Sequence, residues 1–260
     1  MVTPSFQQAL YLPETLASVR AAAEAAPEHE VEHWVIDAGS TDGTRDILRG
    51  QHFAQWISEP DQGQSDAVNK GWARSTGEVL CFLCSDDLWE TDTVRLIAEA
   101  FLKHAEVDLV YGDYAFLEGD SGWRRPKLAG AFSVERLFVH NFLSQPATFM
   151  RRQVYEQFGG LDMTLRYCMD HEYWLRIARD TRWHYIESPL AVMRMHGDAK
   201  TTAKLAEAWD ETAKMADRYG IGPAFRRKAI WMRFLGQPLF RLRRRIYGMF
   251  GKMQGRRNPL

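Results

Sequence analysis

The chain has 260 residues, of which 45% are hydrophobic and 26% are charged, ordinary values for a soluble globular protein. Its three cysteines are too few for a disulfide framework, so we expect a reducing compartment. No stretch of about 18 apolar residues occurs, and the N-terminus lacks the pattern of a signal peptide. We therefore expect neither a membrane-spanning helix nor a secretory leader.

Charge divides the chain into two parts. The stretch 221–260 holds 11 of the 33 Lys and Arg residues and none of the 34 Asp and Glu residues, so it carries +11 while 1–220 carries −12. From Leu239 onward apolar residues recur at helical spacing with arginines between them. We expect a basic amphipathic tail that lies on an anionic membrane surface; docking on the acidic body or on a partner is the alternative. No nucleic-acid recognition motif accompanies the charge.

The first 115 residues alternate short apolar stretches with helical patterns. This alternation predicts a doubly wound α/β structure with a mostly parallel sheet. Ligands bind such sheets at the carboxyl ends of the strands, where Asp37, Asp86 and Asp87, and Asp113 fall. We predict strands over 2–6, 33–37, 55–58, 79–84 and 107–111, and helices over 12–25, 44–49, 64–75 and 91–103.

The second half is less regular. We predict helices over 132–142, 152–158, 169–180 and 205–219, and strands over 147–151 and 183–195. Without repeats or a low-complexity linker, we divide the chain into one catalytic domain (1–220) and a C-terminal tail (221–260). Within that domain, residues 1–115 would form a nucleotide-binding half and 116–220 an acceptor half.

Two adjacent carboxylates, Asp86 and Asp87, end the apolar stretch 79–84. Neighbouring buried carboxylates repel each other and lose solvation, which a divalent cation such as Mg²⁺ would relieve. A helix cap at Asp87 is the alternative. Cys81 and Cys84 lie three apart on the same predicted strand and so point to opposite faces, which excludes a shared zinc ion. We interpret both cysteines as buried and structural.

Four stretches occur in a characteristic order: 2–7, Val35-Ile-Asp-Ala-Gly-Ser-Thr-Asp-Gly-Thr44, 59–71 and 77–87, the last of which ends in Ser85-Asp86-Asp87. Together they closely resemble the inverting glycosyltransferase family 2, whose members have the GT-A fold. The resemblance resumes at 145–149 and 159–162 and continues through 169–176. It implies a Rossmann-like, mostly parallel central sheet flanked by helices, and transfer of a sugar from a nucleotide donor.

Carried over to this chain, the resemblance implies a nucleotide site. Asp37 would bind the nucleobase, usually uracil, although a carboxylate capping its own turn is the alternative. Asp86 would contact the ribose, and Asp87 would bind Mn²⁺ or Mg²⁺ at the diphosphate. Lys70 on a solvated helix face is another open alternative. The remaining residues implied to line the base, ribose or diphosphate are Thr3, Pro4, Ser5, Asp66, Asn69 and Lys70.

The resemblance also implies an acceptor site. Asp170, at the start of a helix, would be the catalytic base that deprotonates the acceptor hydroxyl, with Glu172 as its rival and a helix cap as the alternative. His196 would be a metal ligand or a structural histidine. Trp89, Trp174 and Glu172 would contact the acceptor or sugar, unless the aromatic rings pack in the core.

Two departures from the family pattern stand out. The first strand is short, because Met1 directly precedes Val2, and Ala38 stands where many relatives have a second aspartate. We expect an enzyme that moves a sugar, UDP-linked by preference, to a glycan or polyprenyl-linked saccharide in cell-surface polysaccharide synthesis. It would work in the cytoplasm at the inner face of the cell membrane. A non-catalytic sugar-nucleotide-binding protein and a sugar-nucleotide pyrophosphorylase are the alternatives.

Overall fold

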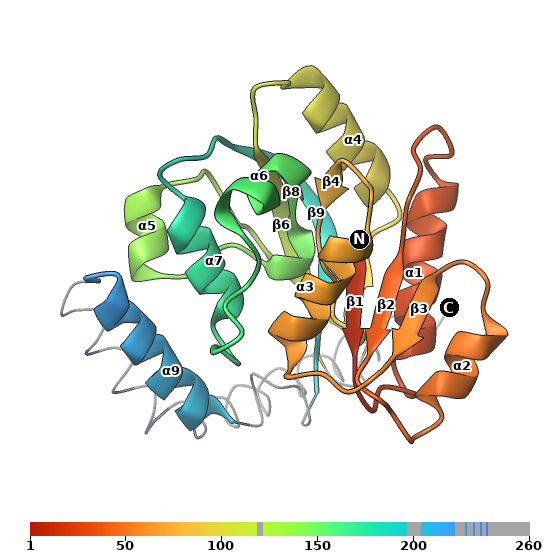
Figure 1. Cartoon of the computed structure of the whole chain (residues 1–260). Coiled ribbons are helices and arrows are strands. Elements are labelled where there is room, and N and C mark those ends of the chain that lie inside the picture. The colour runs from red at the N-terminus through yellow and green to blue at the C-terminus, as the bar shows by residue number, and fades with distance from the viewer. Residues whose placement is uncertain are drawn as a thin grey trace, which may run out of the picture.

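The N-terminal part of the chain forms a parallel three-stranded sheet. Its strands β1 (Val2–Ser5), β2 (Trp34–Asp37) and β3 (Gln55–Ser58) lie in that order, with Val2 beside Trp34 and Trp34 beside Gln55. Helices complete the crossovers that parallel strands require: α1 (Leu12–Glu24), α2 (Thr44–Gly50) and α3 (Gln64–Arg74). The computed structural model describes residues 1–118, 122–196 and 204–221, together with 227, 231, 235 and 238 (Figure 1).

A second, mixed sheet follows in the order β4-β8-β6-β9-β5, with β7 paired to β6. Only β6 and β9 run parallel; the other pairs are antiparallel. The long parallel pair β6–β9 forms the centre of the second half of the chain. The strands are β4 (Val79–Leu80), β5 (Leu88–Trp89), β6 (Leu109–Glu118), β7 (Arg124–Lys127), β8 (Thr148–Arg151) and β9 (Trp183–Met195).

The chain just after β4 joins the two sheets. The Val2 N–H donates to the Cys81 carbonyl at 3.1 Å, and the Leu83 N–H donates to the Val2 carbonyl at 2.9 Å. The same stretch begins with β4, which pairs with β8. Residues 79–83 therefore lie between β1 and β8 and make the two sheets continuous, as the apolar run in the sequence indicates for a central strand.

Helices cover the faces of both sheets. In Figure 1, α1 and α2 lie beside β1–β3, whereas α5, α7 and α9 gather at the opposite side of the molecule. One buried cluster includes Trp72, Tyr111 and Tyr173, and a second includes Trp89 and Val110. No helix among the described residues is long and apolar enough to cross a membrane. The helices of this half are α4 (Thr93–Lys103), α5 (Val134–Val139), α6 (Arg152–Phe158), α7 (Met169–Ile177) and α9 (Leu205–Arg218), with a 3₁₀ turn at Gln145–Ala147.

The structure agrees with the predicted elements at most positions. It departs from them at 79–84, where β4 covers Val79–Leu80, at β5, which we did not predict, and at β6. The expected strand 107–111 instead runs to Glu118 and pairs with β7, which we did not predict. Asp113 is consequently in mid-strand, at a shift of register against β9. Its carboxylate accepts hydrogen bonds from the Ala129 N–H (2.8 Å) and the Tyr185 hydroxyl (2.6 Å), a structural role. The predicted tail 221–260 lies outside the described residues, apart from the isolated positions given above.

Helix α3 approaches β1 so closely that a side chain at Gly71 would not fit. A Cβ there would lie 2.5 Å from the γ-carbons of Val2. We expect Gly71→Ala to lower the free energy of unfolding by about 1–3 kcal/mol, because overpacking outweighs the better helix propensity of alanine. Denaturant titration measures this difference. Gly50→Ala, where a Cβ would have no heavy atom within 4 Å, is the matched control, and equal stability of the two variants would contradict the argument.

Candidate functional site

A hollow of about 500 Å³ lies where the three parallel strands of the first sheet end. Phe6 follows β1, Ala38 follows β2 and Pro60 follows β3, and all three line it. Convergent strand ends of this kind are where α/β sheets bind their ligands. The N-terminus of α3 forms another wall. The other lining residues are Asp61, Gln62, Gly63, Gln64, Ser65, Met163, Leu165 and Arg166.

Asp37 ends β2 beside this hollow and is fully buried. Its carboxylate accepts hydrogen bonds from the Ser40 N–H (3.0 Å), the Ser40 hydroxyl (2.5 Å) and the Ser58 hydroxyl (2.6 Å). These bonds hold the turns after β2 and β3 in place, as the turn-capping alternative predicted. Asp37 therefore shapes the wall of the hollow, and any contact that it makes with a base would be an additional bond.

The residues of α3 that we expected beside the nucleotide do not line the hollow. Lys70 Nζ forms ion pairs with Asp66 and Glu59, both at 3.2 Å, and Asp66 also accepts from the Gln62 N–H at 2.9 Å. Together these bonds fix the loop that follows β3. The Asn69 amide is engaged with the Leu161 backbone on both sides, at 2.9 and 2.8 Å. Asn69 thus joins α3 to the segment that follows α6, in the second half of the chain.

The expected site residues of β1, Thr3, Pro4 and Ser5, are buried and do not line the hollow, which begins at Phe6. Thr3 is fully buried and its hydroxyl contacts His33 Nε2 at 2.9 Å. Pro4 is also buried. Ser5 is 4% exposed, and its hydroxyl has no hydrogen-bond partner among the described residues. A buried hydroxyl without a partner is costly, so Ser5 is poised to bond a ligand at the strand end.

Elements from both halves fix the turn that carries Asp86 and Asp87. The fully buried Thr15 hydroxyl of α1 lies 2.9 Å from the carbonyls of Ser85 and Asp87. Arg194 of β9 donates its backbone N–H to Asp87 Oδ1 at 3.0 Å and its Nε to the Asp86 carbonyl at 3.1 Å. The turn is therefore held rigidly, with its carboxylates in fixed positions.

The ligand atoms of Cys84, Asp86 and Asp87 all lie within 4.8 Å of one another. Asp87 is 6% exposed. Burial first, and then the charge of Asp86, hold the pKa of Asp87 well above its usual range, although the Arg194 N–H lowers it. A bound cation would offset both effects, so this donor set fits a divalent ion such as Mn²⁺ or Mg²⁺, with one sulfur among its ligands. Cys84 is half-buried, not buried as we expected, and its Sγ accepts from the Gln64 amide at 3.1 Å.

His196 directly follows β9 and lies beside the same carboxylates. Its Nε2 lies 2.9 Å from Asp86 Oδ2, and its ring contacts Tyr11 with the centroids 4.5 Å apart. It does not belong to the group of ligand atoms formed by Cys84, Asp86 and Asp87. In this structure His196 therefore orients the Asp86 carboxylate, a task that side chains around metal sites commonly perform.

Asp170 lies in the first turn of α7. Asn141 donates its amide N–H to Asp170 Oδ2 at 3.1 Å, and no side-chain cap bond marks the start of this helix. Burial raises the pKa of Asp170, while the N–H and the charge of His171 and the Asn141 bond lower it. A half-buried carboxylate with a raised pKa has the properties of a general base. His171 is buried, and its Nε2 contacts the Leu137 carbonyl at 2.8 Å.

The three residues expected to contact the acceptor are buried and engaged elsewhere. Trp89 packs on Phe149 and donates its ring N–H to the Pro146 carbonyl at 3.1 Å. Trp174 is 3% exposed and lies in the main core. Glu172 is 2% exposed and binds Arg176 and the Tyr219 hydroxyl. Because these side chains do not face solvent, we assign them to packing. The burial of Glu172 also argues against it as the catalytic base in place of Asp170.

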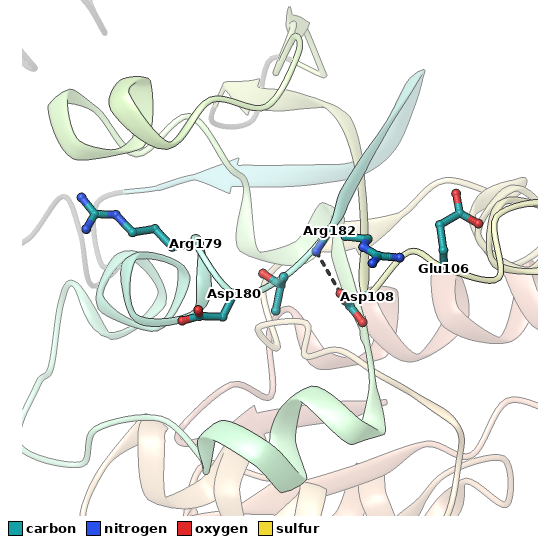
Figure 2. A pocket seen from close by; sticks show the side chains of 6 residues that line it. Glu106, Asp108, Arg179, Asp180 and Arg182 are labelled. Carbon is teal, nitrogen blue, oxygen red and sulfur yellow. Dashed lines mark hydrogen bonds between the residues drawn. The ribbon is translucent and has the colours of Figure 1, made fainter.

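A second hollow, of about 430 Å³, lies where β6 and β9 begin, at the end of these strands opposite to the site (Figure 2). Charges of both signs line it, and Asp108 Oδ2 accepts the Arg182 N–H at 2.9 Å across it. In Figure 2 the Arg179 side chain points away from Asp108. Strands begin at this hollow instead of ending there, and the group of possible metal-ligand atoms found among the described residues lies elsewhere.

Several residues of the site escaped the sequence reasoning. Phe6, Asp61 and Gln64 line the hollow and lie at or near the ends of predicted strands. Because α/β sheets bind ligands at the carboxyl ends of their strands, the sequence contains a signal for these three residues. The pKa of Asp61 is raised, chiefly by burial. The Gly63 N–H opposes this effect, and the nearby charge of Asp66 adds to it. Arg166 comes from the second half of the chain and carries no local signal. Only the tertiary structure brings it to the hollow.

Comparisons with known proteins agree with this arrangement. The family model described as glycosyl transferase family 2 matches residues 1–159. A PGL/p-HBAD biosynthesis glycosyltransferase of Mycobacterium tuberculosis is 32% identical over 184 residues, which cover 68% of each chain. An uncharacterized glycosyltransferase of Nostoc sp. is 32% identical over 176 residues, covering 62% of this chain and 53% of the relative.

Solved structures have the same fold. A fragment of S. aureus TarS in complex with UDP-GlcNAc superimposes with a TM-score of 0.62 at 17% identity, over 82% of this chain and 64% of that fragment. The mannosyltransferase PcManGT of Pyrobaculum calidifontis, in complex with GDP-Man and Mn²⁺, gives 0.62 at 20% identity, over 92% and 70%. The chain covers 42% of a longer TarS structure. With the fold, the strand-end hollow and the family match in agreement, this chain belongs to glycosyltransferase family 2 and has the GT-A fold.

Proposed function

We propose that this glycosyltransferase moves a sugar from a nucleoside diphosphate, preferably UDP, to an acceptor hydroxyl with inversion at the anomeric carbon. The hollow at the ends of β1, β2 and β3 would hold the nucleotide, and this convergence is the observation that carries the proposal. The UDP-GlcNAc and GDP-Man complexes of its structural neighbours support a sugar-nucleotide donor. The acceptor would be a glycan or polyprenyl-linked saccharide in cell-surface polysaccharide synthesis, reached at the inner face of the cell membrane.

In the nucleotide site, Phe6 offers an exposed ring on which a base can stack, being 57% exposed at the rim of the hollow. The Ser5 hydroxyl offers a polar partner for the ligand. Asp86, whose Oδ2 lies 2.9 Å from His196 Nε2, would contact the ribose and diphosphate. Arg166 would bring a positive charge to the hollow, where the donor phosphates are negative.

Asp170 would act as the general base. Inversion in one displacement needs a carboxylate on the side of the sugar opposite to the leaving diphosphate. Asp170 would take the proton of the acceptor hydroxyl as that oxygen attacks the anomeric carbon and the bond to the diphosphate breaks. The Asn141 bond holds Asp170 Oδ2, which fixes the direction of the carboxylate.

Cys84, Asp86 and Asp87 would hold the divalent cation, Mn²⁺ or Mg²⁺. When bound, such an ion supplies positive charge that stabilises the leaving diphosphate. The Thr15 and Arg194 bonds keep the carboxylates in place before the ion arrives. The protein therefore contributes a preformed turn, so that little rearrangement opposes binding.

We expect UDP release from one UDP-sugar of a panel to require Mn²⁺ or Mg²⁺ and to fall on the order of 100-fold or more in Asp87→Ala, because that variant loses the buried carboxylate. A coupled assay of UDP release, with and without EDTA, measures this effect. Asp92→Ala is the matched control, since Asp92 forms only an exposed pair with Arg95. UDP release that does not depend on metal, or equal rates of UDP release in both variants, would contradict the proposed metal site.

A thiol ligand predicts a spectroscopic signature. We expect Cd²⁺ titration to give the ultraviolet absorption of a sulfur–cadmium bond, because soft thiolate sulfur favours such ions. Cys84→Ser should remove the band while UDP binding with Mn²⁺ remains. The buried Cys81 and Cys168 stay in that variant, so a band that persists would show that another thiol is responsible and that Cys84 is not a ligand.

The Asn141 bond predicts a change in pH dependence. The base must be deprotonated, and burial raises the pKa of Asp170, so the rate of UDP release should fall as pH drops through a value above the ordinary carboxyl range. Removing the bond that stabilises the charged form, in Asn141→Ala, should move this acid limb to higher pH. Asp170→Asn should lose about 100-fold or more of the rate at all pH values.

The matched control is Gln153→Ala, which removes an amide–carboxylate bond of 3.2 Å to Asp108, at the beginning of β6. This variant should keep the acid limb of the parent. An acid limb that stays unchanged in Asn141→Ala would show that the titrating group is not the carboxylate that Asn141 bonds.

A further inference from the structure

The segment 162–168, between α6 and α7, belongs to two parts of the site at once. Met163, Leu165 and Arg166 form the wall of the nucleotide hollow that comes from the second half of the chain. The same segment leads directly into α7, which begins at Met169 and carries Asp170. Its backbone position therefore sets both the fit of the donor and the origin of the helix that bears the proposed base.

One carboxylate of α9 holds this backbone. Glu211 Oε2 accepts the N–H of Arg166 at 2.8 Å, and Oε1 accepts the N–H groups of Tyr167 at 2.7 Å and Cys168 at 2.9 Å. Three successive N–H groups at the start of a helix lack partners within the helix, and a negative charge there is favoured by the helix dipole. Glu211 thus accepts all three of these N–H groups with one carboxylate.

Helix α9 is attached at both ends of the segment as well. Arg218 donates to Asp162 Oδ2 at 2.7 Å, and the Tyr219 hydroxyl lies 2.5 Å from Glu172 Oε1 in α7. The chain enters α9 shortly after His196, which contacts Asp86.

The three bonds require a carboxylate. Both oxygens of Glu211 accept, and three backbone N–H groups point at them. A glutamine has almost the same shape but offers one acceptor oxygen, and its NH₂ group would face a backbone N–H. The exchange of Glu for Gln hence tests the hydrogen bonds while it keeps the packing of α9.

We propose that Glu211 is a positioning residue, which fixes the segment 162–168 so that it closes the nucleotide hollow and aims α7 at the acceptor. The inference rests on the proposed function, because it assigns the hollow to the donor. Bonds to backbone N–H groups suit this task, since they set the course of the main chain independently of the side chains of the segment. A helix attached by apolar contacts alone would leave that course free.

The test uses the full chain with Glu211→Gln, and Glu207→Gln as the matched control. Glu207 lies one turn earlier on α9, where it accepts the exposed Tyr167 hydroxyl at 2.8 Å and pairs with Lys204 at 3.6 Å. We expect Glu211→Gln to raise the Kd for UDP and the donor KM about tenfold and to lower kcat about tenfold, and Glu207→Gln to stay within about twofold of the parent. Calorimetric UDP titration and UDP release supply the values, and thermal unfolding gives the folded fraction.

A purely structural role of Glu211 would lower the unfolding temperature but leave Kd and kcat per folded molecule within about twofold of the parent, and this outcome overturns the inference. Glu211→Asp keeps the charge with a shorter reach, so it should restore part of the loss that Glu211→Gln causes. If the parent itself neither binds UDP nor releases it from any sugar nucleotide, the proposed function fails instead. The two failures are thus distinguishable.

Discussion

The rest of the structure depends on the hydrogen bonds of residues 79–83 to strands on both sides. On one side Val2 exchanges bonds with Cys81 and Leu83, and on the other β4 pairs with β8. A strand that is bonded on both edges and buried on both faces has little freedom. The turn at Asp86 and Asp87 emerges from its end, so the position of both carboxylates is set by the sheet. Residues 79–83 also fix the hollow at the ends of β1–β3, because they form hydrogen bonds to β1.

The carboxylates of the site differ in function because their partners differ. Asp37 receives three hydrogen bonds from Ser40 and Ser58, which satisfy it within the protein. Asp87 is equally hidden from water but receives only the Arg194 N–H, and it lies beside another carboxylate. Burying a charge with so little compensation is costly, so Asp87 gains most from a cation. The same residue type thus serves as a structural brace at the end of one strand and as a candidate ligand at the end of another.

The sequence alone was sufficient for most elements and for the Asp86–Asp87 turn, because strand and helix periodicity and strand-end motifs are local signals. It was insufficient where tertiary contacts decide. Asn69 lies in a stretch that resembles a nucleotide site, yet its amide bonds Leu161, distant in sequence. The apolar character of Trp89 and Trp174 fits a sugar platform and a core equally, and only packing separates these alternatives. We predicted Cys84 to be buried because the alternation of side chains along a strand indicates which face each side chain takes. This alternation does not indicate where the strand ends and its residues reach the site.

We divided the chain near residue 115 into a nucleotide half and an acceptor half. This division follows the order of the sequence, whereas residues from both halves build the same turn and hollow. Thr15, from the first half, holds the carbonyl of Asp87, while Arg194, from the second half, holds its carboxylate. Likewise the hollow at the ends of β1–β3 is completed by Leu165 and Arg166. The carboxylate turn and the hollow are therefore each built from both halves of the chain. If the proposed donor site is correct, substitutions in either half that loosen these contacts should change KM and kcat together rather than separately.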